Sequence, residues 1–227
     1  MRFRRCMQRQ QGASLIVSLL MLIAVAMLGL SSAQIALQDA KASRNDIDRQ
    51  LSMQAAEAAL MDAELDIEKS SRSQLFASDK AEGFSQDCDS AQADLYRGLC
   101  LHAKPGQTPI WQAIDFADGA EAVSYGDFTG RALPNGEGLR AARLPRYIIE
   151  LMSYAKAGEP DIKGGMTYFY RITALGFGLR ETTQVMLQAY YRKADSGNTE
   201  APVPAGRFGW HEIPNWRELH DDALAKN

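Results

Sequence analysis

The chain has 227 residues, a formal net charge of −3 and a hydrophobic content of 46%. This length favours one globular domain with an accessory segment. A domain that binds nucleic acid is expected to present a basic face, so the acidic balance argues against direct nucleic-acid binding.

The first twelve residues form a basic leader, which is followed by an apolar run over residues 13–33. No Asp, Glu, Lys or Arg occurs from Gly12 through Gln38. About 20 apolar residues can cross the ~30 Å hydrocarbon core of a bilayer, and the positive-inside rule keeps the arginine-rich end in the cytoplasm. We therefore expect a single-pass helix in contact with membrane lipid. Removing the leader's four arginines from the net charge of −3 leaves about −7.

A cleaved secretory signal is the alternative interpretation of this run. Ser31-Ser32-Ala33 would then be the small-residue cleavage site, and a secreted binding domain would begin at Gln34. The apolar run is longer than the usual 7–15-residue core of a signal peptide. Helical periodicity also continues beyond Ala33, which favours one long helix over residues 13–70.

The second half of this helix is amphipathic. Apolar residues recur at spacings of three and four, which places them on one helical face. These residues are Met53, Ala56, Leu60, Ala63 and Ile67. An adjacent stripe consists of Ile47, Leu51, Ala55 and Ala58. Such a face must be covered, so we expect the later chain to pack against it. From residue 13 to residue 67 the helix would be roughly 80 Å long.

This arrangement resembles a type IV pilin of the PilX group of minor pilins. The resemblance rests on QQGASLIVSLLMLIAVAMLGL and on RQLSMQAAEAALMDAE, and it covers about a third of the chain well. It implies an α+β, pilin-like fold in which the long helix packs on an antiparallel β-sheet head domain. It also implies that a prepilin peptidase cuts the Gly12–Ala13 bond and methylates the new amino terminus.

The resemblance further implies a non-enzymatic role in pilus assembly, which supports twitching motility or adhesion. Other minor pilins, the major pilin, the prepilin peptidase and the inner-membrane assembly platform would be partners, without cofactor or metal. The protein would reside in the inner membrane and then in the pilus. The residues expected in the filament core are Leu15, Ile16, Val17, Leu19, Leu20, Ile23, Val25 and Leu28.

Val17 departs from the family pattern, because pilins carry glutamate at this fifth mature position. That carboxylate is thought to neutralise the terminal amine of a neighbouring subunit, and an unpaired buried charge costs several kcal/mol. A subunit that lacks this glutamate cannot pair with the amine of a subunit ahead of it. We therefore expect it at the pilus tip, in a priming complex, where no subunit lies ahead. The K-type pseudopilin of type II secretion systems also lacks this glutamate and is an alternative, although its head domain is usually larger. A further alternative is that Val17 only improves membrane partitioning.

Three cysteines occur, and Cys6 would be lost with the leader. We predict that Cys88 and Cys100 form a disulfide, whose loop of about 13 residues would contribute on the order of 3 kcal/mol. A metal site with His102 and either Asp87 or Asp89 is the alternative, but the spacing matches no common zinc pattern.

Residues 71–145 are rich in turn formers and contain this cysteine loop, so we expect mainly loops with short strands near 110–114 and 123–128. Within residues 146–193 three segments have strand character: 146–152, 167–175 and 183–191. Gly176 to Gly178 is expected to form part of the hairpin turn. Alternation along these strands predicts an antiparallel meander with one apolar face, which would cover the helix.

Residues 194–227 are expected to form a linker and an aromatic tail. Phe208, Trp210, Ile213 and Trp216 either form an exposed recognition segment or fold back onto the sheet edge, and we favour the second interpretation. No nucleophile-elbow, zinc-protease, P-loop or dinucleotide motif is present, which argues against an enzyme. Carboxylates such as Glu57, Asp62 and Glu64 are expected to be solvated.

Overall fold

The computed structural model describes residues 13–76, 81–86, 88, 94–133, 140–154, 167–194 and 204–226. The leader, including Gly12, lies outside the described residues, as do Asp87 and Asp89. The chain divides into two units, residues 1–47 and residues 48–227. We call the second of these the globular unit.

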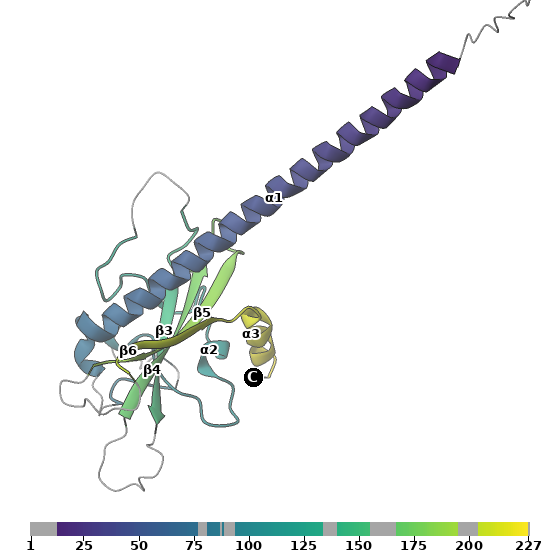
Figure 1. Cartoon of the computed structure of the whole chain (residues 1–227). Coiled ribbons are helices and arrows are strands. Elements are labelled where there is room, and N and C mark those ends of the chain that lie inside the picture. Colours follow the sequence, from purple (N-terminus) through teal and green to yellow (C-terminus); the bar gives the residue numbers. More distant parts are fainter. Residues whose placement is uncertain are drawn as a thin grey trace, which may run out of the picture. The chain divides into compact units, whose positions relative to one another are not determined.

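One uninterrupted helix, α1 (Ala13–Lys69), contributes to both units (Figure 1). It contains no proline, and Gly29 is its only glycine, so no residue interrupts its hydrogen-bond ladder. Most of its residues, such as alanine, leucine and glutamine, are good helix formers. The predicted long helix is therefore confirmed. Lys69 ends it, where a cation complements the carboxyl end of the helix dipole.

The globular unit is built on a sheet of six strands. These are β1 (Leu99–Leu101), β2 (Val123–Ser124), β3 (Arg146–Tyr154), β4 (Thr167–Phe177), β5 (Gln184–Arg192) and β6 (Gly206–Glu212). The order is β1-β3-β4-β5-β6, and β2 also pairs with β3. Strands β3 to β6 form an antiparallel meander, in which Ile149 lies opposite Ile172 and Ile172 opposite Ala189.

The predicted α+β, pilin-like fold is confirmed, with the long helix packed on a mostly antiparallel sheet that one parallel pair makes mixed. Strand β1 runs parallel to β3, with Leu99 opposite Ile149. A parallel pair needs a long connection that returns the chain to the same end of the sheet, and residues 102–145 provide one. Two short 3-10 helices, η1 (Ser73–Leu75) and η2 (Asp94–Tyr96), precede β1.

The three predicted strands of the meander are confirmed as β3, β4 and β5, each within two residues of the predicted limits. The prediction of a strand near residues 110–114 is wrong, because four of these residues form helix α2 (Ile110–Ala113). This helix starts directly after Pro109. Proline favours the beginning of a helix, since its missing N–H has no intrahelical partner there. The hairpin turn also begins later than expected, since Gly176 belongs to β4.

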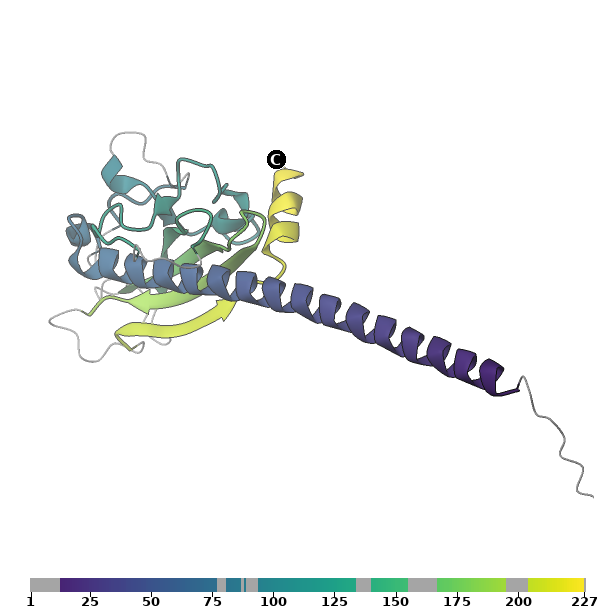
Figure 2. The ribbon, with the colours of Figure 1, turned by 90° about the horizontal axis from the view of Figure 1, so that it is seen from above.

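The two faces of the sheet carry separate cores. On one face, Ile172, Ala174 and Leu187 pack with the part of α1 that belongs to the globular unit (Figure 2). On the other, Leu175 and Phe177 pack with residues of α2 and the segment leading to α3 (Trp216–Leu224). This division follows from strand alternation, because successive side chains point to opposite faces.

The described part of the aromatic tail, residues 204–226, forms regular structure, whereas most of the expected linker lies outside the described residues. Strand β6 adds to β5, and α3 follows it. Ile213 is buried, but Trp210 is 50% exposed. The tail thus folds back onto the sheet edge, as the favoured interpretation states, but it does not bury this tryptophan.

Candidate assembly interface

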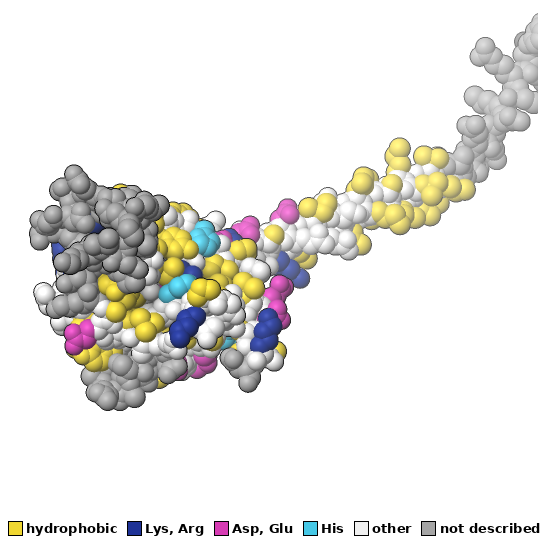
Figure 3. Space-filling model, turned by 90° about the horizontal axis from the view of Figure 1, so that it is seen from below, with side chains coloured by type: hydrophobic (Ala, Val, Ile, Leu, Met, Phe, Trp, Pro, Cys, Tyr) yellow, Lys and Arg dark blue, Asp and Glu magenta, His cyan; other side chains and the backbone are white. Residues whose placement is uncertain are grey.

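The described part of the first unit is an exposed apolar helix. The residues expected in the filament core are all exposed, over a range of 45% for Ile23 to 71% for Leu15. The others are Ile16, Val17, Leu19, Leu20, Val25 and Leu28. Figure 3 shows hydrophobic side chains covering this part of the helix. A contiguous apolar surface of this kind requires lipid or other protein to cover it.

Helix α1 is the one helix within the described residues that is long and apolar enough to cross a membrane. Its position near the amino terminus is also that of a signal sequence, which has the same composition. The helix is therefore consistent with membrane anchoring, and Ala13, the residue expected to follow the cleaved bond, is its first residue.

The amphipathic half of α1 lies on the sheet. Four residues of the apolar face have no solvent exposure: Ala56, Leu60, Ala63 and Ile67. The fifth, Met53, is partly buried and packs against the same core. Two of these residues are alanines, whose small side chains let a helix approach a sheet closely. This is the face that the spacing of apolar residues places against the head domain.

Three residues of the adjacent stripe, Leu51, Ala55 and Ala58, line a groove of about 870 Å³. Leu51 and Ala58 form part of one wall, and Tyr125 and Leu144 part of the other. Arg131 also lines it, and its guanidinium lies 5.8 Å from the centre of the Tyr125 ring.

Helix α1 closely approaches the end of β4 and the hairpin after it at two glycines, Gly176 and Gly178, that the sequence patterns do not identify as contact residues. A Cβ atom at Gly176 would overlap the backbone oxygen of Ser52, whose hydroxyl donates to the Gly176 carbonyl at 2.8 Å. A Cβ atom at Gly178 would overlap the carboxylate of Asp48. Both positions therefore require glycine, because any side chain would push the helix away.

Asp48 joins α1 to the hairpin that connects β4 and β5. Its carboxylate, 2% exposed, accepts hydrogen bonds from Leu179 N–H at 2.5 Å, Arg180 Nε at 3.0 Å and Thr183 Oγ1 at 2.6 Å. Burial by itself raises the pKa of Asp48, but the hydrogen bonds from Thr183, Arg180 and Leu179 outweigh it and lower the pKa below the ordinary value. The charged form is thus favoured in the folded protein.

We expect Gly176→Ala to lower the free energy of unfolding by about 1–3 kcal/mol, since overpacking forces backbone shifts. Urea denaturation of the full chain in detergent, followed by tryptophan fluorescence, measures this. Gly209→Ala is the matched control, because its Cβ would lie 3.8 Å from Tyr190, an ordinary contact. Equal stability of the two variants would contradict the close approach of α1 at Gly176.

Asp48→Asn is expected to destabilise the protein at pH 7, and this effect should shrink progressively as the pH falls below 3.8. The pKa of Asp48 is lowered on folding, so its charge contributes stability above the ordinary value of 3.8, and this contribution disappears as the pH falls through the folded value. Urea midpoints for both proteins between pH 7 and pH 2.5 provide the measurement. A difference that stays constant with pH would refute the role of the charge.

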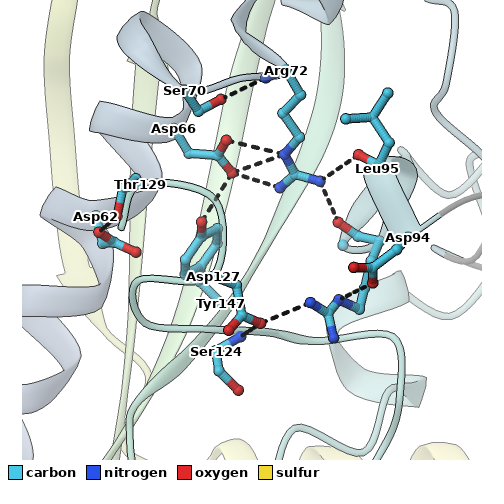
Figure 4. Close-up of polar contacts among 12 residues, drawn as sticks. Asp62, Asp66, Ser70, Arg72, Asp94, Leu95, Ser124, Asp127, Thr129 and Tyr147 are labelled. Carbon is cyan, nitrogen blue, oxygen red and sulfur yellow. Dashed lines mark hydrogen bonds and ion pairs between the residues drawn. The ribbon is translucent and has the colours of Figure 1, made fainter. Parts of the chain in front are cut away.

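A buried ion pair organises the carboxyl end of α1 (Figure 4). The guanidinium of Arg72 bonds to Asp66, with Nη2 at 2.5 Å from Oδ2, and both side chains are fully buried. Its Nη1 donates to the carbonyls of Leu95 and Arg97 at 2.9 and 2.6 Å. The Tyr147 hydroxyl donates to Asp66 at 2.9 Å. Burial, and next the Asp66 charge, raise the pKa of Tyr147 well above its usual value, so this hydroxyl stays protonated.

Asp62 is not solvated, which corrects the sequence-based expectation. It has no solvent exposure and accepts hydrogen bonds from Gly126 N–H at 2.8 Å and from the Thr129 hydroxyl. Burial raises the pKa of Asp62 despite these bonds. Glu64 forms an ion pair with Arg207. The clue in the sequence was the position of Asp62 and Asp66 directly beside apolar-stripe residues.

The predicted disulfide between Cys88 and Cys100 is present, and the two Cα atoms lie 4.3 Å apart. Both cysteines belong to the core that α2 and α3 cover. Within the described residues, no group of three or more His, Cys, Asp and Glu side chains could hold a metal ion. The bond ties β1 to the segment before it.

Two family models match the chain. "PilX N-terminal" matches residues 11–60, and "Type IV pilus assembly protein PilX C-term" matches residues 96–193. Together these segments cover more than half of the chain and include the exposed helix and strands β1 to β5. Searches of curated proteins and of solved structures found no match.

Proposed function

The chain belongs to the PilX family of type IV pilus assembly proteins, and we propose that it is a minor pilin that acts by packing into a filament. The observation that carries this proposal is the exposed apolar half of α1. Its predicted core residues, from Leu15 to Leu28, are at least 45% exposed. In the membrane, lipid would cover them, and during assembly the helices of other subunits would replace the lipid.

The prepilin peptidase is the proposed processing enzyme, and it would cut between Gly12 and Ala13 on the cytoplasmic side. The basic leader supports this orientation under the positive-inside rule. The new amino terminus would be that of α1, which begins at Ala13. No part of this step requires a cofactor or a catalytic group of the protein itself.

Val17 supports a position at the tip, in a priming complex with other minor pilins. A valine cannot neutralise the terminal amine of a subunit ahead of it, and leaving that amine unpaired in a helix core would cost several kcal/mol. The same subunit can still offer its own amine to the subunit behind. Twitching motility or adhesion would then depend on it through the presence of pili. Immunogold labelling at the ends of pili, and not along the shaft, is the expected result.

Mass analysis of the mature amino terminus, from envelope fractions and from sheared pili, tests the proposal. We expect a species that begins with N-methylated Ala13 in both fractions. A species that begins at Gln34 and occurs free in solution would identify a secreted domain and refute the pilin function. An uncut chain would leave a membrane-anchored protein without support for assembly.

A further inference from the structure

Strand β6 is an open edge of the sheet. It pairs with β5 on one side, and none of the described strands pairs with its other side. The segment from Gly209 to Glu212 stays in unbroken register with β5, and the register shift lies before it, between Tyr190 and Tyr191 of β5. The open side is therefore a regular, unbent edge at these four positions.

The direction of the backbone groups of β6 follows from one hydrogen bond. Ile213 N–H donates to Met186 O at 3.0 Å, which makes these opposite residues a hydrogen-bonded pair. Such pairs alternate along an antiparallel ladder, so His211 also directs its backbone N–H and C=O toward β5. Trp210 and Glu212 then direct theirs to the open side, where they can bond to another strand.

Exposed aromatic side chains gather on this strand. Among the large hydrophobic residues that are exposed in the described structure, the two aromatic ones are Phe208 and Trp210, at 38% and 50% exposure. They lie on opposite faces of the sheet. Phe208 stacks on Tyr190 with ring centres 6.0 Å apart, and Trp210 lies opposite Ala189, which belongs to the core beneath α1.

Strand β6 has one usual protection of an edge strand, the register shift at Phe208, but the segment from Gly209 to Glu212 lies beyond this shift. Natural edges carry lysine or proline, or have a bulge that bends the strand away. Strand β6 has neither lysine nor proline. Its Arg207 and Glu212 are each held by the opposite charge on α1, with Glu64 and with Arg49 respectively. Because both charged side chains pair with residues of α1, they do not prevent another strand from pairing with the open side of β6.

We propose that the open side of β6 binds an extended segment of another pilus subunit as an added strand. Trp210 and Glu212 would supply the backbone hydrogen bonds, and the exposed rings of Phe208 and Trp210 would contact apolar side chains on the two faces of the added strand. The segment would be uncharged, since the charges of β6 already have partners. This inference rests on the proposed function, which provides the class of partner.

A photo-crosslinking amino acid at position 208, in the full chain in cells that assemble pili, tests the inference. We expect adducts whose mass spectra identify another pilus subunit and map to one extended segment of it. The same group at position 179 is the matched control, because Leu179 is 40% exposed but lies in the turn between β4 and β5. It should give no such adduct.

Trp210→Pro separates backbone pairing from side-chain contact. It removes the N–H that faces the open side while leaving the hydrogen bonds to β5 in place, so the adduct yield should fall about tenfold, and Trp210→Ala should reduce it less. Trp210→Lys, which adds the charge that natural edges carry, should also abolish the adduct, whereas Leu179→Lys should not. Unchanged far-UV circular dichroism confirms that the variants fold.

Three results would overturn the inference: adducts to a second copy of this chain or to lipid alone, equal adducts from position 179, or a yield that Trp210→Pro and Trp210→Lys leave unchanged. The proposed function is tested apart from it, by counting pili in a strain that lacks the protein. Lost piliation without the adduct at position 208 would refute strand addition but keep the assembly role. Normal piliation in that strain would refute the assembly role itself.

Discussion

Replacing Arg72 with methionine is expected to lower the free energy of unfolding of the globular unit by about 3–5 kcal/mol, because removing one partner of a buried pair leaves the other charge uncompensated. Asp66 would remain buried with only the Tyr147 hydroxyl as a donor. The carbonyls of Leu95 and Arg97 would each lose a hydrogen bond from the guanidinium. Urea denaturation of the full chain in detergent measures the change.

Packing adds to this expected loss. The Arg72 guanidinium lies 3.5 Å from the centre of the Phe128 ring, a distance at which a desolvated cation–π contact is strong. Arg49→Met is the matched control, since Arg49 pairs with Glu212 while its side chain is 56% exposed. Exposed pairs contribute about 0–1 kcal/mol. An Arg72→Met variant no less stable than Arg49→Met would contradict the importance of the buried pair.

A compensating variant distinguishes the pair from the packing around it. Asp66→Leu combined with Arg72→Met removes both charges, and replacing a buried pair with apolar residues is often neutral or stabilising. Adding Tyr147→Phe avoids an unpaired hydroxyl, and we expect this triple variant to recover most of the lost stability. Failure to recover would mean that the bonds to Leu95 and Arg97 matter more than the ion pair.

The long helix and the meander could be predicted because each has a strong local pattern. The uncharged run before Asp39 and the spacing of Ala56, Leu60 and Ile67 determine the character of α1. The strands β3 to β5 alternate clearly, and their inner residues are those in contact with the helix. Such local signals do not depend on where distant segments lie.

The remaining structure depends on distant contacts that leave no periodic signal. Asp48 is buried because it meets a hairpin about 130 residues away, and nothing around it in the sequence indicates this. Strand β1 is three residues long and lies next to a strand some 45 positions later. Strand β6, GRFGWHE, contains two glycines and no regular alternation, so its pairing with β5 could not be predicted.

Two arginines in the apolar half of α1 are expected to have the largest effect of any substitution. Leu20→Arg with Ile23→Arg places both charges on one helical face. Each arginine at the centre of a membrane helix costs about 2.5–3.5 kcal/mol on the insertion scale, or about 5–7 kcal/mol for the pair. The protein should largely disappear from the carbonate-resistant membrane fraction and from sheared pili, by about a thousandfold or more at this cost.

Gln34→Arg with Gln38→Arg is the control, because it adds the same charges to the same helix just beyond the apolar run. Solvent or headgroups can hydrate arginines there, so anchoring should change little. A normal amount of the Leu20 and Ile23 variant in pili would mean that this face is not buried in lipid or filament, which would remove the main support for the minor-pilin proposal. Loss of both variants alike would instead place the buried segment further along α1 than the hydrophobic run predicts.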